Sequence, residues 1–205
     1  MRRDEGQAFP IYVAVVAGLL FLAFAYFAVG QAAFTRNSAQ TAADAAALAA
    51  AQDAREQLRD GWLEVILTPD QWAGFLDGEA YVGLLACDSA ADFASRNSAA
   101  LAGPGCEPLS SGDNGFRVTV RTTGGESNPA MASAEAVIEP RCIFVEQEPT
   151  SEPSTSPPSP SPSDEPEEEP GPILGLSCGG EPWEIDPDDA RLPSASELFT
   201  IRLSE

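Results

Sequence analysis

The chain carries no charged residue between Glu5 and Arg36, and this gap constrains its fold more than any other feature of the sequence. Residues 8–30 within the gap are predominantly apolar and span roughly 34 Å as a helix, more than the hydrocarbon core of about 30 Å. Twelve of them are Phe, Ile, Leu or Val. Together these side chains favour membrane insertion by about 4 to 7 kcal/mol. The segment therefore predicts a transmembrane helix over residues 8–30.

A cleavable signal peptide is the main alternative, because the small residues around Gly30 form an acceptable cleavage site. The apolar region of a signal peptide, however, is normally only about 7–15 residues long. Arg2 and Arg3 precede the span and Arg36 follows it. The positive-inside bias places residues 1–7 in the cytoplasm as a leader and the C-terminal portion outside. We expect a single-pass protein of the cell membrane, in contact with membrane lipid.

The composition excludes several classes of function. The chain has 11 basic and 32 acidic residues, a formal net charge of −21, and neither histidine nor lysine. Nucleic-acid binding depends on cation-rich surfaces, so no nucleic-acid partner is expected. The absence of histidine excludes an ordinary serine triad, and no phosphate-binding glycine motif occurs. We predict that the protein is not an enzyme, holds no cofactor or metal, and has no identifiable small-molecule substrate.

Residues 31–60 predict an Ala-rich helical extension of the span. They contain neither glycine nor proline, and twelve are alanine, the residue with the best helix propensity. We expect one unbroken helix as far as Gly61, since glycine commonly terminates helices. A narrow apolar row follows the helical period and consists of Ala32, Ala39, Ala43, Ala46, Ala50, Ala54 and Leu58. Two interpretations remain open: a solvated stalk, and a face on which another helix packs closely.

Two motifs flank the apolar span, a leader with the sequence RRDEGQAFP and the sequence AADAAALA after the span. Their order resembles the N-terminal region of TadE/TadG-like proteins of Flp (Tad) pilus assembly, over about residues 1–55. The matching positions are Gly6, Gln7 and Pro10 in the leader and Ala42, Ala43, Asp44, Ala45, Ala46, Ala47, Leu48 and Ala49 after the span. The resemblance implies a non-catalytic accessory or structural component of pilus assembly or secretion. It also implies other Tad/Flp membrane proteins as partners through the helix.

The leader departs from that of a processed prepilin. A prepilin would have a glutamate five residues after the glycine, whereas this chain has Ile11 there and its Glu5 precedes Gly6. The resemblance therefore implies an unprocessed, TadG-like chain that stays in the membrane. The alternative function is a membrane-tethered extracellular binding module unrelated to pili.

Residues 62–145 predict a small α+β ectodomain. Thr68 followed by a proline predicts a capped short helix that ends at about Leu76. Asp88 predicts the cap of a second helix over residues 89–101. A core built from about 85 residues is marginal, so covalent cross-links are expected to support it.

The strand predictions come from alternating apolar and polar residues. Residues 116–122 and 132–139 show this period of two and predict an antiparallel pair, and residues 143–146 continue in extended form. In the C-terminal segment, residues 198–203 predict a further strand and Trp183 is a residue that can pack against the domain.

The chain has four cysteines, Cys87, Cys106, Cys142 and Cys178, with no Cys-x-x-Cys pair among them. In an exported chain, disulfides are expected rather than a zinc site. The sequence permits three pairings; local proximity favours Cys87 with Cys106, which leaves Cys142 with Cys178. The second pairing returns residues 173–205 to the ectodomain as a packed C-terminal segment. Four free thiols are expected instead if the chain faces the cytoplasm.

Residues 146–172 predict a disordered linker rich in Pro, Ser and Glu. Nine prolines and almost no apolar side chains exclude a packed core there. A proline-recognition ligand is the alternative to a solvated spacer, and the carboxylates of residues 164–169 lack the loop of a calcium site. The sequence as a whole predicts a single-pass membrane protein with a long N-terminal α-helix, a small disulfide-stabilised α+β ectodomain and a Pro-rich disordered segment.

Overall fold

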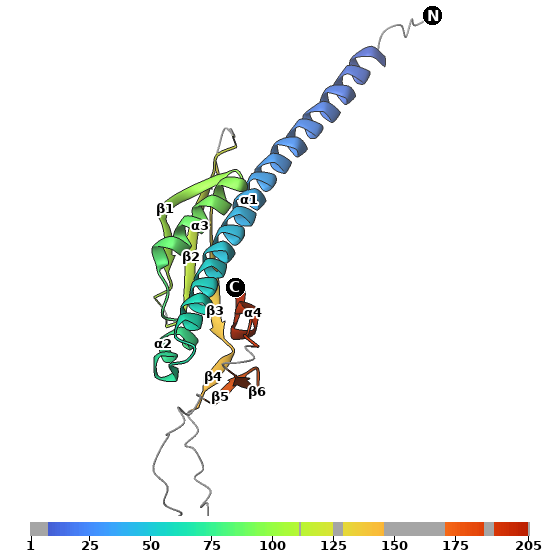
Figure 1. The fold of residues 1–205 in the computed structure, drawn as a ribbon. Coiled ribbons are helices and arrows are strands. Elements are labelled where there is room, and N and C mark those ends of the chain that lie inside the picture. The colour runs from blue at the N-terminus through green and yellow to red at the C-terminus, as the bar shows by residue number, and fades with distance from the viewer. Residues whose placement is uncertain (1–7, 111, 125–128, 146–170, 187–190, 205) are drawn as a thin grey trace, which may run out of the picture.

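The computed structural model describes residues 8–110, 112–124, 129–145, 171–186 and 191–204. Helix α1 (Ala8–Glu64) is an unbroken rod of 57 residues. Its N-terminal half projects away from the rest of the chain, and its C-terminal half lies within a domain (Figure 1). The prediction that one helix runs from the apolar span into the Ala-rich extension is thereby confirmed.

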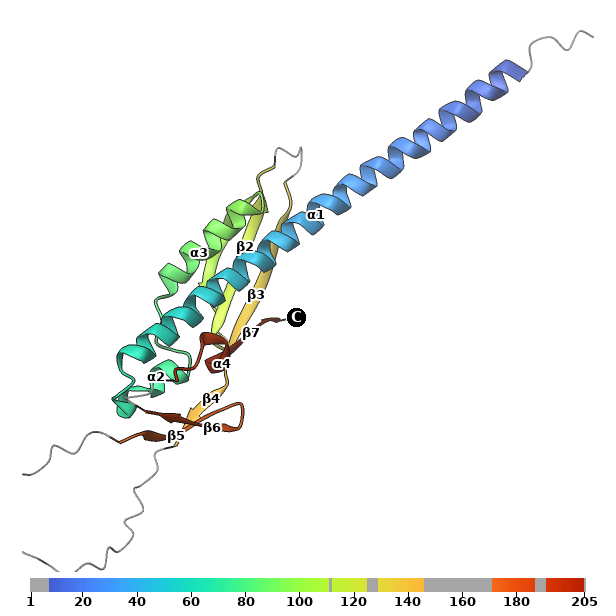
Figure 2. The ribbon, with the colours of Figure 1, turned by 45° about the vertical axis from the view of Figure 1, so that its right-hand side comes forward.

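The domain has two layers. Helix α3 (Gly83–Arg96) and the second half of α1 cover one face of a four-stranded antiparallel sheet (Figure 2). The sheet has the spatial order β1-β2-β3-β7. Its strands are β1 (Ala99–Pro108), β2 (Gly115–Thr122), β3 (Met131–Pro140) and β7 (Phe199–Ser204). The sheet therefore joins residues near the C-terminus to the middle of the chain.

A second antiparallel sheet lies at the end of the domain farthest from the N-terminus of α1 (Figure 1). It consists of β4 (Cys142–Phe144), β5 (Ile173–Cys178) and β6 (Glu181–Ile185), in that spatial order. Short helices complete the fold: η1 (Pro69–Gln71) and α2 (Ala73–Leu76) follow α1, and α4 (Ala195–Leu198) precedes β7. Beyond α1, the described residues are thus mostly sheet, more so than the predicted α+β ectodomain implies.

Alanine side chains form the centre of the core. The alanine row predicted on α1 is fully buried from Ala39 to Ala54, and it ends on the buried Leu58, whereas Ala32 is exposed. Helix α3 contributes a second row at intervals of four residues, namely Ala86, Ala90 and Ala94. Small side chains on both helices let the two backbones approach closely. The row that the sequence offered to another helix is therefore packed inside its own chain, and this half of α1 is not a solvated stalk.

Polar contacts fix α3 against α1 beside the alanines. Ser89 Oγ donates a hydrogen bond to Asp53 Oδ2 (2.6 Å), and Gln57 Nε2 donates one to Asp53 Oδ1 (2.6 Å). The backbone N–H of Val82 in turn donates to Gln57 Oε1 (2.8 Å). These bonds fix the position of α3 along the axis of α1.

An aromatic cluster lies between the small sheet and the C-terminal end of α1, at the far end of the core. Trp62 and Trp72 are fully buried with their ring centroids 5.3 Å apart, and Phe144 of β4 lies 4.8 Å from Trp72. Trp72 Nε1 donates a hydrogen bond to the carbonyl of Val65 (3.0 Å). The small sheet therefore packs through Phe144 on Trp72, and Trp72 in turn packs on Trp62 of α1.

The first helix ends later than predicted, at Glu64 instead of Gly61. Gly61 lies inside the helix at a point where a Cβ atom would collide with the ring of Phe75. Its absent side chain serves close packing, and the helix continues so that Trp62 reaches the core. Thr68 makes no side-chain capping bond, and the predicted helix after it is divided into η1 and α2 around the buried Trp72.

The prediction of a helix over residues 89–101 was wrong at both ends. Helix α3 begins at Gly83, so Asp88 lies inside it, and Leu101 belongs to β1. Packing of its alanine row on α1 determines where the helix lies, and Ser98 with φ of 54° reverses the chain into β1. A local capping signal is weaker than this packing.

The predicted strands over residues 116–122 and 132–139 are confirmed, the one over residues 198–203 begins one residue later at Phe199, and the extended stretch after Cys142 forms a strand only as far as Phe144. Strands β2 and β3 pair antiparallel and β7 pairs with β3, while Trp183 of β6 packs against the core.

The favoured cysteine pairing is also present: Cys87 is bonded to Cys106, which joins α3 to β1, and Cys142 is bonded to Cys178. Cys142 and Cys178 face each other directly in the β4–β5 register. The predicted disordered linker lies almost wholly outside the described residues.

The alanine packing predicts the effect of enlarging one side chain. Ala90→Leu inserts bulk between α3 and α1, so the free energy of unfolding should fall by about 1–3 kcal/mol. Ala91→Leu is the matched control, because Ala91 is exposed on the same helix and its change should stay within about 0.5 kcal/mol. Urea unfolding of the full chain in detergent measures both. Equal losses for the two variants would contradict the packing described.

Candidate functional site

The first half of α1 is the most distinctive surface of the protein. We call residues 9–34 the apolar rod. Phe9, Phe21 and Tyr26 leave 75, 71 and 84 % of their surface exposed. Phe34 is also exposed, four residues beyond the predicted end of the span. The same helix becomes buried only from Ala39 onward, so one continuous element has a bare apolar half and a packed half.

The apolar rod is apolar on all sides. The consecutive residues Leu19, Leu20, Phe21 and Leu22 are 62–71 % exposed, and successive side chains of a helix project about 100° apart. A helix that lies on a membrane surface would have a polar face instead. In length and composition the helix is sufficient to cross a membrane, and its most apolar stretch makes no buried contact with the domain. All-round apolarity is typical of a helix inserted in lipid or enclosed by other chains.

A polar junction connects the apolar rod to the domain. The Asp44 carboxylate accepts a hydrogen bond from Gln40 Nε2 (2.7 Å), and the same nitrogen lies 3.5 Å from the carbonyl oxygen of Ser133. Ser133 lies where β3 extends past β7, whose pairing begins at Glu135. Gln40 and Asp44 therefore cover an open edge of β3. Sequence reasoning could not find this role, because it depends on how β3 is placed beside α1.

The other family-motif residues lie mainly in the core. Ala42, Ala43, Ala46, Ala47 and Ala49 are buried, Ala45 and Leu48 are partly buried, and Asp44 is partly exposed. Pro10 lies in the first turn of α1, where a helix needs no backbone N–H. Gly6 and Gln7 lie outside the described residues. The motif after the span thus forms part of the domain core. Asp44, the one acidic residue of the motif, orients Gln40.

The outer face of the large sheet carries paired charges. Arg117 Nε donates to Glu135 Oε1 (2.6 Å), and Arg202 Nε donates to Glu139 Oε1 (2.7 Å). The hydrogen bond from Arg117 holds the pKa of Glu135 below its usual range, and the hydrogen bond to Glu139 raises the pKa of Arg202. These ion pairs connect β3 to the strands on either side.

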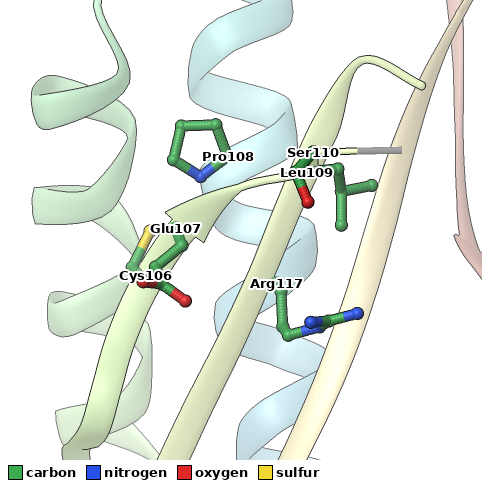
Figure 3. A pocket seen from close by; sticks show the side chains of 6 residues that line it. All are labelled: Cys106, Glu107, Pro108, Leu109, Ser110 and Arg117. Atoms are coloured by element: carbon green, nitrogen blue, oxygen red, sulfur yellow. The ribbon is translucent and has the colours of Figure 1, made fainter. Parts of the chain in front are cut away.

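A hollow opens beside these charges. It has a volume of about 390 Å³ and is lined by Cys106, Glu107, Pro108, Leu109, Ser110 and Arg117 (Figure 3). Arg117 is directed toward β3, where it binds Glu135, and not toward Glu107. Cys106 is held in a disulfide and is not a nucleophile. Within the described ranges, no group of three or more potential metal ligands occurs.

The fold and the apolar rod together define a class of protein: a long, partly bare helix continuous with a two-layer, disulfide-bonded domain. Residues 6–53 match the model of a family described as putative Flp pilus-assembly TadE/G-like. The resemblance seen in the sequence is confirmed for this region, which contains the whole apolar rod and most of the buried alanine row. No curated protein and no solved structure matches the chain.

The Arg117–Glu135 pair predicts a dependence of stability on pH. Because the pKa of Glu135 is lower in the folded chain than in the unfolded chain, the ion pair stabilises the fold at neutral pH. This contribution is lost as the pH falls below about 4.5, the ordinary value, and through the lowered pKa. Glu135→Gln should therefore make the free energy of unfolding fall less steeply between pH 5 and pH 3.

Urea unfolding at several pH values measures this slope. Glu56→Gln is the control, because Glu56 is exposed on α1 and its carboxylate forms no ion pair with any residue that the structure describes. The control should keep the slope of the unmodified chain. A slope unchanged by Glu135→Gln would show that this ion pair contributes nothing to the acid response.

Proposed function

We propose that the chain is a membrane-anchored, non-catalytic accessory or structural component of Flp pilus assembly or secretion. The observation that carries this proposal is the apolar rod, which is exposed on all sides and continues without a break into the core of the domain. The match of residues 6–53 to the TadE/G-like family supports a role in pilus assembly. The domain beyond the rod is then the part that acts outside the membrane.

The proposed orientation has the N-terminus in the cytoplasm and the domain outside. Arg2 and Arg3 before the span support it through the positive-inside bias. The two disulfides also support it, because disulfides form and persist in oxidising compartments outside the cytoplasm. Ile11 stands five residues after Gly6, where a processed prepilin would have a glutamate, and this favours a TadG-like chain that stays in the membrane.

The apolar rod is the proposed contact with other pilus-assembly membrane proteins. Ala43, Ala46 and Ala50 have no exposed surface, so they are not accessible to a partner chain. Their replacement by leucine would disrupt the domain core and would report on folding instead of association. The exposed side chains of residues 9–34 are therefore the surface on which partner binding inside the membrane is to be tested.

The anchor is tested by placing charges in the apolar rod. Each arginine at the centre of a span opposes insertion by about 2.5–3.5 kcal/mol. Leu19→Arg combined with Leu20→Arg therefore cancels most or all of the gain of about 4 to 7 kcal/mol from the apolar residues. The double variant should be extracted from membranes by alkaline carbonate, and the unmodified chain should stay in the pellet.

The matched control is Gln31→Arg combined with Ala32→Arg, which adds the same charge just outside the predicted span. This control should remain in the membrane pellet. Extraction of the unmodified chain would contradict the anchor. Retention of the Leu19→Arg, Leu20→Arg variant would also contradict it.

The role in pilus assembly is tested in cells that lack the chain. Restoring the unmodified chain should restore Flp pili, counted by electron microscopy, and the Leu19→Arg, Leu20→Arg variant should not restore them. The alternative function, a tethered binding module unrelated to pili, predicts normal pili in the absence of the chain. It also predicts cross-linking of the domain to a partner that is not a pilus-assembly protein.

A further inference from the structure

Two exposed arginines lie at the rod end of the domain. Arg36 lies on α1 and Arg121 lies near the end of β2, and both are exposed. Neither forms an ion pair in the part of the chain that the structure describes. In the full sequence, acids outnumber bases 32 to 11. Among the other arginines that the structure describes, Arg59, Arg96, Arg117 and Arg202 contact carboxylates, whereas Arg55, Arg141 and Arg191 form no ion pair with a described residue.

The two arginines lie at about the same level along α1. The 3.5 Å contact between Gln40 Nε2 and the Ser133 carbonyl places these two residues side by side. Toward the N-terminal end, Arg36 is four helical residues from Gln40, about 6 Å. Met131, which faces Arg121 in the β2–β3 register, is two strand residues from Ser133, about 7 Å.

The two arginines flank the end of the large sheet: Arg121, like Arg117, projects from the outer face of the sheet, whereas Arg36 lies on α1, which covers the opposite face. Arg36 precedes the buried Ala54 by five full helical turns, so it projects from the side of α1 on which the domain packs. Figure 2 shows the ends of β2 and β3 beside the point where α1 leaves the domain. Met131, beside Arg121, leaves 59 % of its surface exposed. We call Arg36, Arg121 and Met131 the rod-end edge.

The rod-end edge is within reach of lipid headgroups when residues 8–30 span a membrane. Arg36 is six helical residues beyond Gly30, about 9 Å. The headgroup region extends about 5–8 Å beyond the hydrocarbon core on each side. Arginine is long and extends its guanidinium toward phosphates, and side chains of a helix lean toward its N-terminus. In this chain that direction is toward the membrane.

We propose that the rod-end edge rests on anionic phospholipid headgroups, with Arg36 and Arg121 binding phosphates and Met131 entering the interface. This inference rests on the proposed membrane anchor. Guanidinium groups bind phosphate with two hydrogen bonds in a fixed geometry, and an exposed methionine beside them suits the boundary between headgroups and acyl chains. The bilayer is the proposed partner because α1 of the same chain holds the rod-end edge at the height of the lipid headgroups.

The contact also sets how the domain stands on the membrane. An anionic surface repels a chain with a net charge of −21. The rod-end edge presents cations at the end of the domain nearest the lipid. Since α1 has no break between rod and core, binding at this edge fixes the tilt of the whole molecule.

The test uses the full chain with Met131→Trp in nanodiscs, with lipids brominated near the top of the acyl chain as quenchers. The unmodified chain is measured in parallel, because Trp62, Trp72 and Trp183 also fluoresce. In discs that contain phosphatidylglycerol, the variant should show additional quenching relative to the unmodified chain, which is the signal of the new tryptophan. The quenching should be largely lost in discs of phosphatidylcholine alone. It should also be lost in the anionic discs when Arg36→Gln and Arg121→Gln are added.

Arg191→Gln is the matched control. It removes an exposed arginine from the segment that leads into Pro193, whose carbonyl accepts a hydrogen bond from Arg59 near the other end of the buried half of α1. This control should keep the quenching seen in anionic discs. Equal thermal unfolding of all variants establishes that they are folded.

Failure of the two proposals gives different results. If the chain does not enter nanodiscs, the proposed membrane anchor fails. If the chain enters anionic discs but the tryptophan is not quenched there, the anchor stands and the contact at the rod-end edge is overturned. Quenching that is unaffected by Arg36→Gln and Arg121→Gln also overturns the contact.

Discussion

Close packing of alanine against alanine between α1 and α3 is the interaction on which the rest of the structure depends. The two helices share one face of the large sheet, and small side chains on both are what permit this. Each alanine buries little apolar area, so the two helices alone would associate weakly. The aromatic cluster around Trp62 and Trp72, the returning strand β7 and two disulfides supply the remaining stabilisation.

Much of this fold was predictable because its signals are local. The uncharged gap, the glycine-free stretch of residues 31–60, the alternation in β2 and β3 and the cysteine spacing were each visible in the sequence alone. The partner of the alanine row was not predictable, since a helix rich in alanine offers almost no contrast between its buried and exposed sides. Ala45 is partly exposed and Ala46 is fully buried, yet the two residues are chemically identical.

The candidate site also has features that were predictable from the sequence and features that were not. The apolar rod was evident from composition, and the proposed pilus-assembly role follows from it together with the family match. The role of Asp44 at the edge of β3 and the common level of Arg36 and Arg121 depend on the placement of β3 beside α1. Such a placement is a product of long-range pairing, which no short stretch of sequence encodes.

The Cys142–Cys178 bond determines where the sequence of this chain can most easily change in length. It joins neighbouring strands on either side of the interval from Val145 to Gly171, so both ends of that interval are held together whatever lies between them. Loop-closure entropy rises only by about 0.6 kcal/mol for each doubling of length. The interval is therefore a natural place for lengthening, shortening or insertion of a reporter, because the fold on either side is already closed.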